Sequence, residues 1–234
     1  MANKDLQKTS DRQAIDLFID QVNKMPAIHT REGRLIFALD ATASRQASWD
    51  QACELQSELF LATRDLGGLS VQLCYYRGFG EFRVTPWIND TSELLHRMNG
   101  VSCLGGHTQI RKVLSQAVKE TRIKQVRAII LVVDCCEENP DTLCQTAGEL
   151  GMLNTPVFIF HEGQDSQAGQ IFQQICKLSG GAYTPFDSHS ADVLRDLLAA
   201  VAVYASGGRK ALEQLSTSQS QHIKRLTQQL GKQE

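Results

Sequence analysis

The chain has 234 residues, 42% of them hydrophobic and 21% charged, which suits one large α/β domain or two small domains. Its 24 Lys and Arg nearly balance its 26 Asp and Glu, and the net charge of −2 argues against non-specific binding to nucleic acid or anionic membranes. No apolar run approaches the roughly 20 residues of a membrane span, so we expect no membrane-spanning helix.

Apolar residues follow two periodicities, which predict strands that alternate with helices. An N-terminal helix is expected to begin at Ser10 and to end at Pro26. The runs 35–39 and 128–133 are apolar throughout, as in strands buried on both faces. The turn at 78–80 predicts a hairpin, with one antiparallel strand at an edge of the sheet. In chain order, the predicted strands are 35–39, 71–75, 81–84, 128–133, 156–160 and 183–186.

Helical patterns separate most of these strands and imply a mostly parallel sheet with helices on both faces. Ser48 and Gln51 form a capping box, which predicts a helix that begins there and stops at Gly67. Further helices are expected to begin near Thr108 and, after an Asn-Pro pair, at Pro140.

The chain is predicted to have one α/β domain with a helical segment at each end. We place an N-terminal helical extension at 1–31, the domain at 32–206 and a C-terminal helical tail at 207–234. The tail is rich in Gln, Ser, Lys and Leu, and its leucines form a broken stripe.

Five oxygen-bearing side chains lie where strands end or a helix begins. Asp40 ends the first buried strand, and Thr42 and Ser44 follow at every second position, on the same side of an extended segment. Asp134 ends the other strongly apolar strand, and Thr108 follows a Gly-Gly-His segment at a helix start. If the two strands are neighbours, these groups share the crevice where open α/β sheets bind ligands. Such oxygen ligands suit Mg²⁺ or Mn²⁺, whereas Ca²⁺ usually takes more of them.

The same positions resemble the metal-ion-dependent adhesion site (MIDAS) of von Willebrand factor type A (VWA) domains. In that family an Asp-x-Ser-x-Ser motif follows the first strand, and a distant Thr and a distant Asp complete the site. The resemblance covers roughly 35–204 and implies a Rossmann-like sheet of about six strands with one antiparallel edge strand. It also implies that the five matching residues bind metal, one carboxylate acting through water. Those residues are Asp40, Thr42, Ser44, Thr108 and Asp134.

Two positions depart from the family's pattern. Thr42 stands where the middle Ser is usual, which keeps the hydroxyl and adds a methyl group. Cys135 follows Asp134 where the family commonly has a Gly, which changes the loop but leaves the carboxylate in place.

The resemblance implies a protein-interaction module and no catalysis. A partner's Asp or Glu would occupy an open coordination position, within a multiprotein assembly as for intracellular members of the family. The helix that begins near Thr108 is expected to add its positive end to the crevice. The chain has no nucleophile elbow and no phosphate loop. Two alternatives stay open: a Mg²⁺-dependent phosphohydrolase on a similar sheet, and a metal-free scaffold that binds through its C-terminal helix.

The number and spacing of the cysteines indicate in which cellular compartment the protein is expected. Their number, seven, is odd, and their spacing shows no disulfide framework. Because the first residues also lack the apolar core of a secretory signal, we expect a cytoplasmic protein. Cys135 and Cys136 are adjacent and lack the spacing of zinc ligands, so packing is the favoured role. Glu137 and Glu138 are expected to form a solvated pair at a helix entry.

Overall fold

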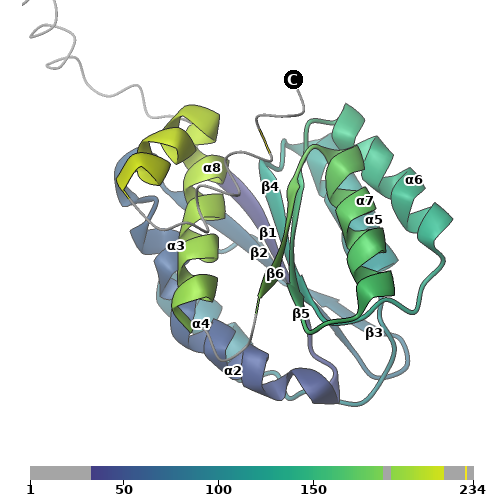
Figure 1. Cartoon of the computed structure of the whole chain (residues 1–234). Coiled ribbons are helices and arrows are strands. Elements are labelled where there is room, and N and C mark those ends of the chain that lie inside the picture. The colour runs from purple at the N-terminus through teal and green to yellow at the C-terminus, as the bar shows by residue number, and fades with distance from the viewer. Residues whose placement is uncertain (1–32, 187–190, 219–229, 231–234) are drawn as a thin grey trace, which may run out of the picture. The chain divides into compact units, whose positions relative to one another are not determined.

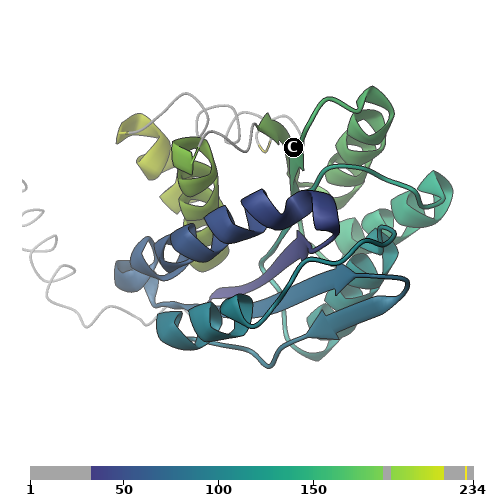
Figure 2. The same ribbon diagram turned by 90° about the horizontal axis from the view of Figure 1, so that it is seen from below.

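The computed structural model describes residues 33–186, 191–218 and 230. It contains one six-stranded sheet with the strand order β3-β2-β1-β4-β5-β6. All neighbouring strands pair in parallel except β3, which runs antiparallel to β2 at one edge, as their opposed arrows show (Figure 2). The predicted Rossmann-like α/β fold with one antiparallel edge strand is therefore confirmed. The strands are β1 (Gly33–Asp40), β2 (Leu69–Arg77), β3 (Glu81–Val84), β4 (Ala128–Val133), β5 (Val157–Glu162) and β6 (Ala182–Phe186).

Helices cover both faces of the sheet, as predicted (Figure 1). One face carries α2, α3, α4 and α8, and the other carries α5, α6 and α7 (Figure 1). Two short 3₁₀ turns, Ala43–Arg45 and Arg64–Leu66, flank α2 and α3. The helices are α2 (Gln46–Leu55), α3 (Ser57–Leu61), α4 (Thr91–Asn99), α5 (Ile110–Ile123), α6 (Pro140–Met152), α7 (Ser166–Ser179) and α8 (Ala191–Ser218).

Two apolar cores lie on the two faces of the central strands, because side chains alternate along a strand. In β1, Leu35 and Phe37 belong to one core, whereas Ile36 and Ala38 belong to the other. Burial of a large apolar side chain contributes roughly 1.5–3 kcal/mol. The buried central strands therefore fix the positions at which the loops after their carboxyl ends begin.

The start of α2 differs from the prediction. The helix begins at Gln46, directly after a 3₁₀ turn, and no side chain caps it. Ser48 is buried, and its hydroxyl donates to the carboxylate of Glu162 instead of a helix amide. The predicted capping box is therefore wrong, because a tertiary contact takes the hydroxyl. The predicted single helix is divided into α2, α3 and a 3₁₀ turn. This helical segment ends at Gly67 as predicted, where the backbone is left-handed with φ of 98°.

The ends of the chain are described only in part. The predicted N-terminal extension 1–31 lies outside the described residues, as do 219–229 and 231–234 of the predicted tail. Within α8 the backbone leaves helical geometry at Gly208, where φ is 71°. Beyond this kink, the buried Leu212 packs into the core on the α8 face of the sheet. None of the described helices is long and apolar enough to cross a membrane.

Candidate metal centre

The two predicted carboxylates leave the sheet side by side. Strands β1 and β4 are parallel neighbours, with Leu39 paired to Val132. Asp40 ends β1, and Asp134 follows β4 directly. Strand β1 lies between β2 and β4 in the sheet. The chain adds β2 and β3 on one side of β1 and then crosses to add β4 on the other, so the centre lies where the strand order reverses. Open α/β sheets bind their ligands at such a switch point.

Asp40 is a buried carboxylate with one free oxygen. Its side chain is 2% exposed, and its Oδ1 accepts a hydrogen bond of 2.7 Å from the backbone N–H of Thr42. Its Oδ2 is buried without a hydrogen-bond partner among the described residues. Burial raises the pKa of Asp40 from 3.8 to about 6, against the hydrogen bonds with Thr42, and the nearby Asp134 also raises it. A cation at Oδ2 would favour the ionised form.

A chain of hydrogen bonds links the Asp40 loop to Asp134. The hydroxyl oxygens of Thr42 and Ser44 lie 3.4 Å apart. The Ser44 hydroxyl donates to Oδ2 of Asp134 at 3.0 Å. Oδ1 of Asp134 is buried and, in the described part of the chain, has no hydrogen-bond partner. The structure therefore brings four of the five predicted site residues together and leaves one carboxylate oxygen of each Asp without a partner.

Thr108 lies at the same edge but is held differently. Its backbone N–H donates to the Glu137 carboxylate at 3.0 Å, and its hydroxyl accepts from the Glu137 N–H at 3.1 Å. No hydrogen bond between described residues joins Thr108 to Asp40 or Asp134. The loop that follows Asp134 thus fixes Thr108, and its role as a ligand stays a prediction.

The two glutamates after Asp134 hold the start of α5. The carboxylate of Glu138 accepts the backbone N–H groups of Ile110 and Arg111, the latter at 3.1 Å. Burial raises the pKa of Glu138. These glutamate oxygens bind amides at the start of α5, which offsets the positive end that we expected this helix to add to the crevice. Of the expected solvated pair, Glu137 is exposed and Glu138 is partly buried, and both accept hydrogen bonds from this loop.

A buried histidine that we did not predict supports the Asp134 loop. One ring nitrogen of His161, Nε2, lies 3.0 Å from the carbonyl oxygen of Asp134, and the other lies 2.8 Å from the Tyr183 hydroxyl. Because a carbonyl oxygen only accepts, Nε2 must carry a proton and donate a hydrogen bond to Asp134. The only sequence signal was a polar residue at the end of an otherwise apolar strand.

Two further unpredicted groups lie close to the carboxylates. The buried Arg45 pairs with Glu162, and its charge lowers the pKa of Asp40. Tyr76 pairs with Asp40 across β1 and β2, and its buried hydroxyl has no hydrogen-bond partner among the described residues. Tyr76 reaches the centre through strand pairing, which sequence spacing does not show, whereas Arg45 directly follows Ser44 in the 3₁₀ turn.

The donor set fits a hard divalent cation. Unpartnered carboxylate oxygens cost free energy when buried, and a cation would satisfy them. The described residues contain no group of three or more His, Cys, Asp or Glu side chains suited to a metal, so a thiolate or histidine site has no support there. Cys135 and Cys136 are free thiols, and burial raises the pKa of Cys135 to about 12, which disfavours a thiolate ligand at neutral pH.

Solved structures resemble this fold, although no family model and no curated protein matches the chain. The von Willebrand factor type A structure from Catenulispora acidiphila is 16% identical, with a TM-score of 0.63 over 75% of this chain and 43% of that chain. The SpRpn10 VWA domain is also 16% identical, with a TM-score of 0.57 over 71% of this chain and 94% of that chain. The fold is that of a VWA domain.

A third similar structure carries a metal. Proximal thread matrix protein 1 from the mussel byssus, solved with a zinc-occupied MIDAS motif, is 14% identical, with a TM-score of 0.53 over 74% of this chain and 46% of that chain. This chain spans less than half of that protein and of the Catenulispora protein. At these identities the likeness establishes the VWA fold alone.

Proposed function

We propose that the chain is a protein-interaction module that binds a divalent cation and, through it, an acidic group of a partner protein. The observation that carries this proposal is the pair of buried carboxylate oxygens without partners, Oδ2 of Asp40 and Oδ1 of Asp134. Mg²⁺ is the favoured ion and Mn²⁺ the next, because all the candidate ligands are oxygens. The ligands would come from Asp40, Thr42, Ser44, Thr108 and Asp134.

The charge of the ligand set supports an acidic partner. Two carboxylates would only balance a divalent cation, and the hydroxyls add no formal charge. The buried Arg45 guanidinium adds positive charge nearby. A bound ion supplies an open coordination position, and an Asp or Glu carboxylate of the partner is the ligand that suits it.

The proposal includes the setting in which the module acts. The zinc-occupied MIDAS of the mussel protein supports metal binding on this fold. We place the partner within a multiprotein assembly. The seven free thiols support a reducing compartment, so the proposed location is the cytoplasm. We propose no catalytic activity.

Metal titration tests the centre directly. We expect Mg²⁺ and Mn²⁺ to bind the wild-type chain in calorimetry and to raise its melting temperature, since a ligand of the folded state stabilises it. Asp40→Ala should abolish both effects while circular dichroism shows an unchanged fold. The exposed Asp65→Ala is the matched control and should bind as the wild type does. Binding that persists in Asp40→Ala would contradict the proposed site.

Capture of partners tests the function. A pull-down with Mg²⁺, with a chelator and with Asp40→Ala should yield a partner only in the first case. The metal-free scaffold predicts instead that removal of residues 209–234 abolishes capture and that the chelator has no effect. The phosphohydrolase alternative predicts Mg²⁺-dependent release of phosphate that Asp40→Asn abolishes, and we expect none.

A further inference from the structure

A groove of about 690 Å³ lies beside the metal centre, between the edge strand β3 and helix α5. Its lining includes Thr108, which is a candidate metal ligand, Glu138, four positions after Asp134, and Phe82 of β3. Most of the remaining described lining belongs to α5. The groove therefore begins where the candidate metal ligands end.

Basic side chains of α5 give this groove its charge. Arg111, Lys112 and Lys119 line it, and Glu138 is the acidic residue of the described lining. The carboxylate of Glu138 already accepts the backbone N–H groups at the start of α5. Arg111 and Lys119 are exposed and form no ion pair with a described residue. They lie eight positions apart, so both face the same side of the helix.

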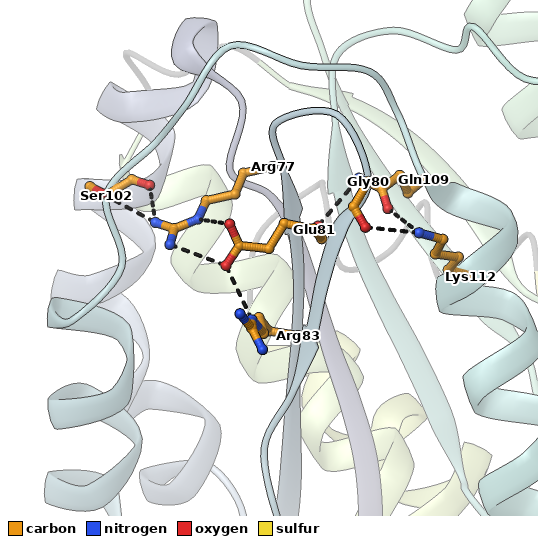
Figure 3. Close-up of polar contacts among 7 residues, drawn as sticks. All are labelled: Arg77, Gly80, Glu81, Arg83, Ser102, Gln109 and Lys112. Atoms are coloured by element: carbon orange, nitrogen blue, oxygen red, sulfur yellow. Dashed lines mark hydrogen bonds and ion pairs between the residues drawn. The ribbon is translucent and has the colours of Figure 1, made fainter.

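Polar contacts join the start of α5 to the β2–β3 hairpin beside the groove (Figure 3). Nζ of Lys112 donates to the carbonyl oxygen of Gly80 at 3.0 Å and to Oε1 of Gln109 at 2.7 Å. Nε2 of Gln109 donates to the carbonyl oxygen of Glu81 at 3.3 Å. On the other side of the hairpin, Arg77 binds the carboxylate of Glu81 at 3.0 Å (Figure 3). Lys112 is thus held by the hairpin, which leaves Arg111 and Lys119 available to a ligand.

We infer that this groove binds an extended acidic segment of the protein partner, continuous with the carboxylate at the metal centre. The inference rests on the proposed function and names the partner's chemistry. Arg111 and Lys119 are separated by about 12 Å along the helix axis, a length that about four extended residues span. The partner segment therefore carries further acidic side chains about four residues apart.

A protein segment fits this groove better than nucleic acid does. The net charge of the whole chain is −2, which disfavours a polyanion that contacts a large surface. Single-stranded nucleic acid stacks its bases on several aromatic side chains, whereas Phe82 is the aromatic residue of the described lining.

Fluorescence anisotropy with two labelled peptides tests this inference on the full chain. One probe is hepta-glutamate, and the other carries a single Glu among Gly and Ser. In Mg²⁺ and low salt, hepta-glutamate should bind more tightly than the single-Glu peptide. The double variant Arg111→Gln/Lys119→Gln should weaken hepta-glutamate binding about three- to tenfold and leave the single-Glu peptide unchanged. The exposed pair Arg127→Gln/Lys177→Gln removes the same charges elsewhere and should have no effect.

Each other outcome has a definite meaning. Equal affinity for the two peptides, or equal losses in the two double variants, would overturn the groove inference. Asp40→Ala separates it from the proposed function. If Asp40→Ala and EDTA leave hepta-glutamate binding unchanged while loss of Arg111 and Lys119 still weakens it, the proposed function fails and the inference that the groove binds an acidic segment stands. Tighter binding of a ten-residue oligothymidylate at the same two side chains would overturn the protein segment in favour of nucleic acid.

Discussion

Strand β1 carries a buried charge near each end, and the two ends are built differently. Near the amino end, Arg34 is 6% exposed, pairs with Glu120 at 3.0 Å and lies 3.7 Å from the centroid of the Trp87 ring. The indole N–H of Trp87 donates to the same carboxylate at 2.9 Å. At the carboxyl end, Asp40 is equally enclosed, yet its Oδ2 has no partner in the described part of the chain.

The two charges differ in their partners: Arg34 has an ion-pair partner, whereas one oxygen of Asp40 has no hydrogen-bond partner among the described residues. Arg34, Glu120 and Trp87 are joined by an ion pair, a cation–ring contact and a hydrogen bond. The loss of one side chain therefore removes a partner of the other two. Asp40 is held by Thr42 on one oxygen alone, so its burial costs free energy that a cation would offset. The same strand can therefore be tested at both ends, and the two ends should respond to mutation with opposite signs.

The largest effect is expected at the amino end. Arg34→Met would leave the partly buried Glu120 carboxylate without its cation, and we expect a loss of about 3 kcal/mol in the free energy of unfolding. Urea denaturation measures it. Arg122→Met breaks the exposed pair with Glu149 and should cost less than about 1 kcal/mol. Mg²⁺ affinity should not change in either variant, and a change in Arg34→Met would show that the two ends are coupled.

Asp40→Asn should stabilise the protein in EDTA at pH 7.5. The pKa of Asp40 in the folded state is about 6, above the ordinary 3.8. Above about pH 6 the ionised carboxylate therefore lowers the free energy of unfolding by up to about 3 kcal/mol. Asn keeps the acceptor for the Thr42 N–H and carries no charge. With Mg²⁺ at about 100 times its dissociation constant, the wild type should gain about 2.7 kcal/mol and the variant nothing.

The pH dependence gives this prediction its sign. Between pH 3.8 and about 6 the unfolded chain loses the Asp40 proton while the folded chain keeps it, so rising pH lowers wild-type stability in EDTA. The gain from Asp40→Asn should be absent below about pH 4 and complete above about pH 7. A variant that is less stable than the wild type at every pH would show that the carboxylate is structural.

A smaller effect is expected where His161 supports the Asp134 loop. His161→Leu removes the donor to the Asp134 carbonyl, and we expect Mn²⁺ affinity to fall about tenfold or more, as for other groups that orient metal ligands. His161→Gln can place an amide N–H near the same carbonyl and should restore most of the affinity. Electron paramagnetic resonance of Mn²⁺ measures both. Equal losses in the two variants would assign His161 to packing alone.

The strands and the clustered carboxylates could be predicted from sequence because both depend on local pattern. The run 128–133 is apolar throughout, short and rich in β-branched residues, which favours a buried strand over a helix. All six predicted strands are present. Asp40, Thr42 and Ser44 lie within five residues, and the structure brings them together. The predicted extended segment is wrong beyond Thr42, because residues 43–45 form a 3₁₀ turn.

The remaining features depend on contacts that no local window contains. Ser48 has a capping pattern, yet its hydroxyl binds Glu162, which lies 114 positions away. His161 lies 27 positions from Asp134, whose carbonyl it binds. The close packing of Arg45 against Glu162 likewise follows from the sheet order, which brings β5 near the loop after β1.

The smallest effect is expected for Ser44, and it tests how much of the centre depends on hydroxyls. Ser44 is exposed, so loss of its 3.0 Å hydrogen bond to Asp134 should change stability by less than about 1 kcal/mol. Ser44→Ala should nevertheless lower Mg²⁺ affinity several-fold in calorimetry, since it removes both a candidate ligand and a donor that orients Asp134. Thr42→Ser keeps its hydroxyl and serves as the control, with affinity near that of the wild type. If Ser44→Ala leaves Mg²⁺ affinity unchanged while Asp40→Ala abolishes binding, the carboxylates alone hold the ion and the hydroxyls only shape the loop.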